Sequence, residues 1–327
     1  MKRNLLVGGG RSRGLSFSVF TEAELDQIHY ATLEVLERTG IFVEDDEALD
    51  IFKDGGCRVD REAHIVRIPP HVVEDAIHSS PSKYVLCGRD PKNDFLMEPG
   101  RVAFTNFSEG IAVIDLATGE HRDSTLADVA AIARMNDYLS EFDTHEIAVG
   151  ARDVPHQTAA VHNTEAQLHN TTKPIGIGPL SGLECRAILQ MCAAVVGGED
   201  ELRERPIVYG GVCPVSPLKL PRDATEVIIE CSRWWIPNNI LSMAMSGGSS
   251  PVSLSGTLVV HNAEVLSGIV LAQLTERGCP MMYGSSTTAM DLKLAAASVG
   301  SPEICLISAA VAELARRYQI PSFVAGL

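Results

Sequence analysis

Three carboxylates stand where an acidic side chain could take part in chemistry. Glu109 follows an apolar run typical of a strand, Asp291 follows the polar loop after another such run, and Glu303 comes directly after Pro302. Acids that follow buried parallel strands lie at the active-site edge of a sheet, where they can act as general acids, bases or charge partners. Two of these acids can instead have a simple structural role. An acid beside Pro302 stabilises a first helical turn by a few tenths to about 1 kcal/mol. Asp291 can cap a turn. As catalytic residues we favour Glu109 and Asp291 over Glu303.

Two loops rich in small polar residues also follow predicted strands. The first contains Ser246 and Gly247, and the second contains Ser285 and Ser286. Their backbone amides and hydroxyl groups could contact a ligand, although small residues also simply allow a tight turn from strand to helix. The sequence leaves both interpretations open.

The elements that position these residues follow a repeating pattern. Seven apolar runs of strand type alternate with helical segments, and their starts fall roughly 30 to 45 residues apart, as in βα units. No glycine fingerprint follows the first run, so a dinucleotide-binding fold is disfavoured. We therefore predict a TIM (β/α)8-type barrel over 101–327, incomplete at its C-terminal end, after a small N-terminal α+β segment over 1–100. The seven runs are 101–107, 145–151, 173–180, 205–212, 238–248, 280–286 and 321–327.

The N-terminal segment contains a recognisable helix start. Thr21 and Glu24 have the spacing of a capping box, and apolar residues at helical spacing follow until Gly40. The sequence therefore predicts a helix that begins just after Thr21.

Composition excludes several classes of function. A net charge of −15 makes a nucleic-acid partner improbable, since phosphate binding needs clustered Lys and Arg. The eight cysteines are scattered and no signal peptide precedes them, so we expect reduced thiols and a cytoplasmic protein. Cys213 and Cys279 lie near strand ends but have no His or Cys at ligand spacing, so we predict no metal site. Charged or polar residues interrupt the longest apolar stretches, so we expect no membrane span.

Several segments in order resemble the trimethylamine methyltransferase family. The most specific are CPVSPL (213–218) and PVSLSG (251–256), and FTNFSEG (104–110), LHNTTKPIG (168–176) and LEVLERTGIFVEDDEAL (33–49) add to them. The resemblance covers essentially the whole chain. It implies a TIM barrel that moves a methyl group from a methylated amine to the Co(I) of a separate corrinoid protein. It also implies no tightly bound cofactor, and it suggests self-association.

The resemblance assigns roles to residues already singled out. A methylammonium pocket should present aromatic faces, because a cation over a ring gains roughly 0.5–2 kcal/mol, together with a carboxylate. Phe107 and Tyr283 are the aromatic residues we expect there, although either could pack at the rim instead. The loops around Ser246 and Gly247, and around Ser285 and Ser286, would face the corrin ring.

The substrate stays open between two kinds of amine. Trimethylamine must be protonated or otherwise activated before a neutral amine can leave, whereas glycine betaine is already quaternary. Members of the family that act on trimethylamine carry pyrrolysine, encoded by an amber codon, after a segment like PSFVAGL. We therefore expect pyrrolysine at position 328 and a sequence truncated at that codon. The alternatives are a methyltransferase for glycine betaine or another quaternary amine, and an inactive fragment that only binds a corrinoid protein.

Overall fold

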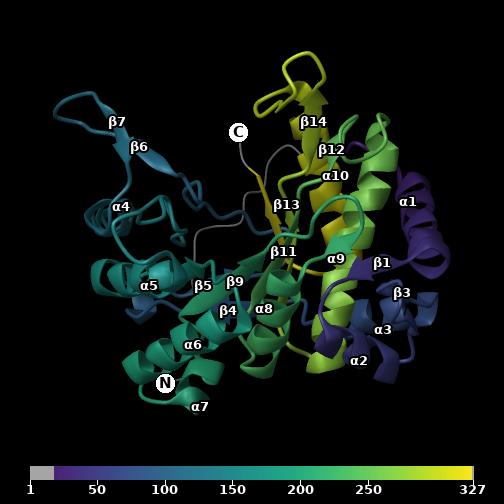
Figure 1. Cartoon of the computed structure of the whole chain (residues 1–327), viewed down its shortest axis with the longest axis horizontal. Helices are drawn as coiled ribbons and strands as arrows, with labels where there is room; N and C mark the ends of the chain where they lie inside the picture. Colours follow the sequence, from purple (N-terminus) through teal and green to yellow (C-terminus); the bar gives the residue numbers. More distant parts are fainter. Residues whose placement is uncertain (1–17, 326–327) are drawn as a thin grey trace. The chain divides into compact units, whose positions relative to one another are not determined.

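The computed structural model describes residues 18–325 (Figure 1). They fall into two compact units, which we call the middle unit (84–211) and the terminal unit (18–83 together with 212–325). Residues 18–83 cluster with the last third of the chain, whereas residues 84–100 belong to the middle unit, and the predicted boundary at residue 100 stays a prediction.

The middle unit contains two short hairpins, a pair of parallel strands and four α-helices. In the parallel pair Gly176 lies opposite Tyr209. The chain between them passes through two helices, as in the βα units that the sequence predicts. The elements are β4 (Tyr84–Leu86), β5 (Phe95–Met97), β6 (Ala112–Ile114), β7 (His121–Asp123), α4 (Leu126–Tyr138), α5 (Ala159–Asn170), β8 (Ile175–Ile177), α6 (Gly182–Val196), α7 (Glu199–Glu204) and β9 (Val208–Val212), with 3-10 turns at Pro91–Asn93 and His156–Thr158.

The first two predicted strands, over 101–107 and 145–151, are wrong as regular strands. Neither run forms a regular ladder: isolated parallel bridges join Gly110 to Val149 and His145 to Ile175, and the Asp143 amide donates to the Phe104 carbonyl at 2.8 Å. The side chain of Asn106 takes the place of a backbone ladder. Its Oδ1 accepts from the Glu146 amide at 2.9 Å and its Nδ2 donates to the Glu146 carbonyl at 3.0 Å. These contacts fix the backbone of Glu146.

The terminal unit contains three further predicted strands, all parallel. In the order β16–β13–β11, Tyr283 lies between Ser322 and Ile240. Five of the seven predicted strands thus form, and the protein has a mixed α/β fold. The remaining elements are α1 (Glu22–Glu34), a π-helical turn (Val35–Thr39), β1 (Ile41–Val43), α2 (Asp46–Asp54), β2 (Arg58–Asp60), β3 (Ile65–Arg67), α3 (Pro70–Ser79), β10 (Lys219–Leu220), α8 (Arg222–Arg233), β11 (Asn238–Ser242), β12 (Met245–Ser246), α9 (Leu254–Thr275), β13 (Met281–Ser285), β14 (Thr288–Asp291), β15 (Ala296–Ala297), α10 (Pro302–Tyr318) and β16 (Ser322–Val324).

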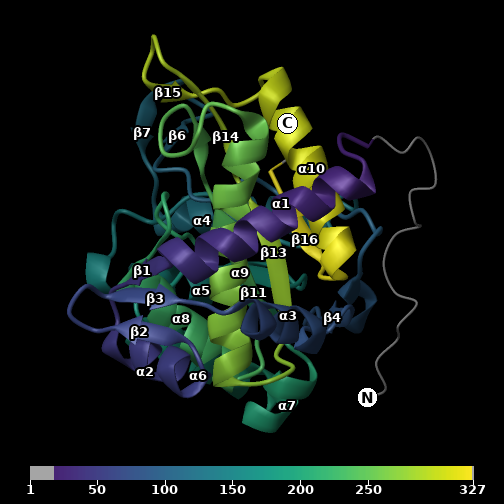
Figure 2. The same cartoon turned by 90° about the vertical axis from the view of Figure 1, so that its right-hand side faces the viewer.

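Helix α9 is the core of the terminal unit. It packs against β11 and β13 and is contacted by α1, α2, α3 and α8, so it can be apolar on every side (Figure 2). Among residues 18–325 it is the one helix long and apolar enough to cross a membrane, but 72% of its most apolar window is buried inside the protein. Its apolar composition is therefore explained by packing.

The N-terminal part of this unit begins as the sequence predicts. Thr21 Oγ1 accepts from the Glu24 amide at 3.3 Å and Glu24 Oε2 accepts from the Thr21 amide at 2.8 Å, so the capping box is confirmed. Helix α1 continues into a π-helical turn that ends at Gly40, where φ is +80°. A Cβ there would overlap the Val66 carbonyl, so glycine is required.

Candidate functional site

A glycine of strand β8 and a second glycine directly after the strand leave room for two carboxylates. Gly176 lies in β8 and Gly178 directly follows its last residue. Because alternate residues of an extended chain point to the same face, the two glycines open adjacent spaces about 7 Å apart. The carboxylate of Glu146 fills the first, at a position that a Cβ on residue 176 would overlap. The carboxylate of Glu109 fills the second, with Oε1 2.5 Å from where a Cβ on Gly178 would stand. Both acids therefore lie at the carboxyl end of β8.

Glu109 reaches this position through a backbone conformation that is unusual for its residue type. Its φ is +62°, in the left-handed region, which costs a residue with a side chain about 1–2 kcal/mol. Its amide donates to the Ile147 carbonyl at 2.7 Å, which holds the turn in place. The side chain keeps exposed surface, yet the protein around it removes enough water to raise its pKa. Strain at a carboxylate that faces another carboxylate is typical of functional sites.

Glu146 is an acid of the middle unit with a strongly raised pKa. Burial raises its pKa to about 7, a hydrogen bond from Tyr209 opposes the rise, and the negative charge of Glu109 adds to it. Tyr209 is 2% exposed, and its hydroxyl lies 3.3 Å from Thr144 Oγ1. A carboxyl group with a pKa near neutrality can both hold and release a proton in this pH range.

The two other predicted catalytic acids, Asp291 and Glu303, belong to the terminal unit. Asp291 Oδ1 accepts from the amides of Lys293 and Leu294 at 2.9 and 3.0 Å, so it caps a turn of the β14–β15 loop. Glu303 is exposed in the first turn of α10, which begins at Pro302. Both occupy the plainer roles that the sequence left open.

The aromatic residues predicted for the substrate pocket lie in very different surroundings. Phe107 is 83% exposed. Tyr283 is 0% exposed, and its hydroxyl donates to Asn262 Oδ1 at 2.7 Å in helix α9. Its ring also packs edge-on against His261. Tyr283 points to the helix-covered side of its strand, because side chains alternate along β13 and its neighbour Gly284 faces Asn239 instead.

The four residues predicted in the small polar loops also differ in their exposure. Ser246 donates to the Val252 carbonyl at 2.7 Å and is 6% exposed, and Ser285 is 1% exposed and accepts from the Thr287 amide. These two serines hold their own loops together. Gly247, with φ at +82°, and Ser286 keep partly exposed surface.

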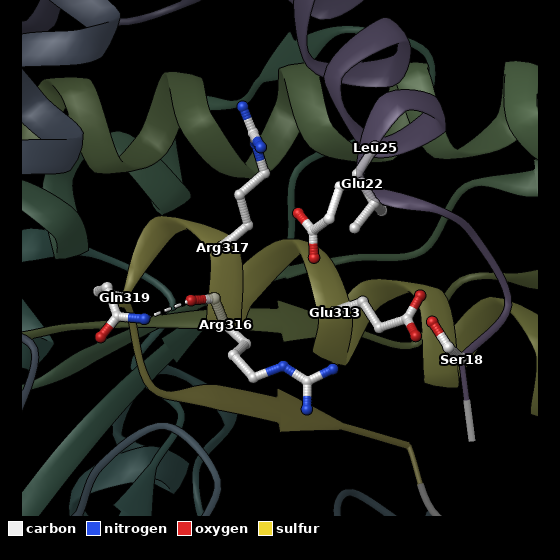
Figure 3. Close-up of a pocket in the computed structure, with 7 residues that line it drawn as sticks. All are labelled: Ser18, Glu22, Leu25, Glu313, Arg316, Arg317 and Gln319. Atoms are coloured by element: carbon white, nitrogen blue, oxygen red, sulfur yellow. Dashed lines mark hydrogen bonds between the residues drawn. The ribbon is translucent and has the colours of Figure 1, made fainter. Parts of the chain in front are cut away.

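A surface pocket of the terminal unit lies elsewhere (Figure 3). It is formed by α1 and the last turns of α10, with Glu313, Arg316 and Gln319 along its wall. Glu313, 4% exposed, accepts from the amides of Val19 and Phe20 and so anchors the entry to α1. Because α10 leads into the amino end of β16, this pocket is at the stability side of the parallel strands rather than at their carboxyl ends. Within residues 18–325, no group of three or more His, Cys, Asp or Glu could hold a metal ion.

Glu146 and Tyr209 are the residues that the sequence analysis missed. Glu146 is an acid inside the apolar run HEIAVGA, and Tyr209 lies in the middle of RPIVYGGV. The signal that could have found the pair is the GIG of KPIGIGPL, since glycines two apart in a strand mark open space on one face.

A family described as trimethylamine methyltransferase (MTTB) matches residues 11–327. The chain belongs to this family of methyltransferases.

Individual relatives agree with the family assignment. The chain is 50% identical over 98% of its length to trimethylamine methyltransferase MttB of Desulfitobacterium hafniense, and 48% identical over 99% to MttB of Methanosarcina thermophila. It is 30% identical over 94% to a glycine betaine methyltransferase of Desulfitobacterium hafniense. It spans 64%, 68% and 64% of these three relatives, or about two thirds of their length.

Solved structures support the fold. The monomethylamine methyltransferase MtmB of Methanosarcina barkeri matches 93% of this chain with a TM-score of 0.53 at 15% identity, and the chain covers 67% of it. A likeness at this identity concerns the fold alone. The prediction of pyrrolysine at position 328 lies beyond this sequence and stays a prediction.

Proposed function

We propose that the full-length protein transfers a methyl group from trimethylamine to a corrinoid carried by a separate protein. The observation that supports this most directly is the carboxylate pair of Glu109 and Glu146 at the carboxyl end of β8, in a chain of this family. The relatives named for trimethylamine are 46–50% identical, and the one named for glycine betaine is 30% identical. This difference favours trimethylamine as the substrate.

The chemistry of the leaving group gives the carboxylate pair its role. The Co(I) of the corrinoid supplies the nucleophile that displaces the methyl carbon. A neutral amine leaves only if the nitrogen of trimethylamine is protonated or otherwise bears positive charge. Glu109 and Glu146 attract such a cation, and Glu146, whose pKa is about 7, can keep a proton near the nitrogen.

The surroundings of the pair suit this task. Tyr209 is buried beside Glu146 and fixes the carboxylate, while Asn106 holds the Glu146 backbone from the other side. A positioned group acts far better than a mobile one, because orientation lowers the barrier before the reaction starts. The middle unit therefore offers a negatively charged, oriented site for a small cation.

The finer features of the fold belong to the same proposal. We infer that the parallel strands are part of a TIM (β/α)8-type barrel whose remaining elements lie in the rest of the full-length protein. The corrinoid protein would approach the carboxyl ends of the strands, where Gly247 and Ser286 keep exposed surface. No cofactor held by this chain itself is needed, and self-association fits the same architecture.

The experiment is a transfer assay with the purified full-length protein and its cognate corrinoid protein. Methylation of Co(I) is followed by the change in the visible spectrum, with trimethylamine or glycine betaine as methyl donor. We expect transfer from trimethylamine and none from glycine betaine. Transfer from glycine betaine alone contradicts the proposal. Binding of the corrinoid protein without transfer from either donor supports an inactive scaffold instead.

A further inference from the structure

A buried carboxylate in helix α9 has no place in the site described so far. Glu264 is 1% exposed on a helix that is otherwise mostly apolar. Burying a carboxylate without compensation costs several kcal/mol, so such a group needs partners. Among the ion pairs of residues 18–325 none includes Glu264. Its compensation comes from hydrogen-bond donors in loops that are distant in sequence.

Both carboxylate oxygens of Glu264 are engaged by strand-end segments. Ser216 Oγ and Ser242 Oγ donate to Oε2 at 2.8 and 2.6 Å, and the Leu218 amide donates to Oε1 at 2.9 Å. Ser242 is the last residue of β11. Ser216 and Leu218 belong to the turn that follows β9. A single side chain thus joins the turn 215–219 and the end of β11 to the core helix.

The turn held by Glu264 is tightly built. Val215 and Lys219 exchange both backbone hydrogen bonds, at 2.8 and 3.0 Å, and close the turn. Leu218 has φ at +57°, a left-handed conformation that costs about 1–2 kcal/mol for a residue with a side chain. The bond from its amide to Glu264 helps to offset this cost. Without the carboxylate the turn loses the two hydrogen bonds that Ser216 and Leu218 donate to α9.

A second residue of α9, His261, contacts the loop that follows β13. Thr287 Oγ1 donates to the Ser242 carbonyl at 3.2 Å, so it accepts from Nδ1–H of His261, which lies 2.9 Å away. Burial lowers the pKa of His261 to about 3, so the ring is neutral. His261 and Glu264 are three residues apart and therefore lie on one face of the helix. Together they fix the turn 215–219, the end of β11 and the loop 285–288.

We propose that Glu264 is a positioning residue, which together with His261 sets the geometry of the strand-end loops 215–219 and 285–288 for methyl transfer. The kinetic part of this inference rests on the proposed function. Loops at the carboxyl ends of parallel strands carry catalytic and partner-binding groups, and a misplacement of about 1 Å can reduce a rate about 100-fold. Glu264 touches neither the amine nor the corrin, and acts through the loops.

The test compares three variants of the full-length protein. Glu264→Ala removes the acceptor for all three donors, and Glu264→Gln keeps the shape and one carbonyl oxygen. Ser267→Ala is the matched control, because Ser267 is also buried in α9 but its hydroxyl donates only to the Glu264 carbonyl of its own helix. Hydrogen exchange over residues 213–220 reports the turn directly, and kcat and KM for methyl transfer report its consequence.

Glu264→Ala should accelerate exchange in 213–220 and lower kcat about 10- to 100-fold, with KM for the amine changed less than about 3-fold. Glu264→Gln should restore most of kcat, and Ser267→Ala should leave both readouts at wild-type values. If Glu264→Ala does not fold, Glu264→Gln and Ser216→Ala carry the test, each with a smaller effect in the same direction.

Two results overturn the inference. Unchanged exchange over 213–220 in Glu264→Ala shows that the carboxylate does not hold the turn. Faster exchange with an unchanged kcat shows that holding the turn does not serve catalysis. If the wild-type protein transfers no methyl group at all, the proposed function fails while the exchange measurement still decides whether Glu264 holds the turn.

Discussion

The carboxylate of Glu146 occupies the space above Gly176, where any larger residue would place its Cβ. The acid comes from an extended segment and the glycine from β8, so the contact forms only when the two run side by side. Gly178 gives Glu109 the same kind of space two residues further along. The candidate site therefore depends on two glycines that leave space for the acids, rather than on a sequence motif around the acids themselves.

Gly176→Ala should therefore disturb the site, because it adds a methyl group where the Glu146 carboxylate lies. The new Cβ overlaps the Glu146 carboxylate and forces it to move. Overpacking of this kind costs about 1–3 kcal/mol, and a displaced acid should lower methyl transfer up to about 100-fold. Denaturant unfolding and the transfer assay measure the two effects. Gly211→Ala in β9 is the control, since a Cβ there meets no atom within 4 Å. Equal behaviour of the two variants contradicts the account.

The raised pKa of Glu146 predicts a specific dependence of stability on pH. The ordinary pKa of a glutamate, 4.5, applies to the unfolded chain, and the folded value is about 7. Between these values the folded state binds more protons, so the stability contributed by Glu146 is present below pH 4.5 and is lost as pH rises through 7. In Glu146→Gln this loss should disappear. Urea unfolding of both proteins from pH 4.5 to 8 measures the difference, with the exposed Glu303→Gln as control. Parallel curves for wild type and Glu146→Gln contradict the assignment.

Tyr209→Phe should move the pH profile of methyl transfer. The Tyr209 hydroxyl stabilises the ionised form of Glu146, so its removal raises the pKa of that carboxyl further. The limb of the kcat profile that reports Glu146 should shift to higher pH, while the variant stays folded because a phenyl ring fills the same space. A profile that drops in height without shifting would mean that Tyr209 acts through packing alone.

Tyr283→Phe separates a packing role from a role in substrate binding. The variant leaves Asn262 Oδ1 without its donor in a fully buried site, which costs about 1–3 kcal/mol. Because Tyr283 lies under helix α9, KM for the amine should stay unchanged. Thermal or denaturant unfolding and a KM measurement decide the matter. A raised KM at unchanged stability would return Tyr283 to the substrate pocket.

Much of the fold could be read from local patterns. The capping box of α1, Pro302 at the start of α10 and five of the seven apolar runs all formed as predicted. The runs over 101–107 and 145–151 did not become strands, because the side chain of Asn106 replaces the backbone partners that a ladder would need. Such a replacement is set by tertiary contacts and cannot be seen in apolar periodicity.

The site was harder to predict than the elements. The position of Glu109 beside a strand end could be predicted because it follows an apolar run, and its catalytic role stays a prediction. Glu146, Tyr209 and Glu264 stand inside apolar runs, where the pattern predicts only core residues. Their roles depend on which face of a strand or helix they occupy and on what lies opposite. The sequence of one element does not contain that information.

We propose that Glu109 and Glu146 act together in methyl transfer from trimethylamine. The most direct measurement is a double-mutant cycle of kcat/KM for Glu109→Gln, Glu146→Gln and the double variant, in the full-length protein with its corrinoid partner. Residues that act as a unit give non-additive effects. We predict that each single variant loses about 100-fold or more and that the double variant is hardly worse than either. Single variants that retain wild-type kcat/KM would contradict the claim.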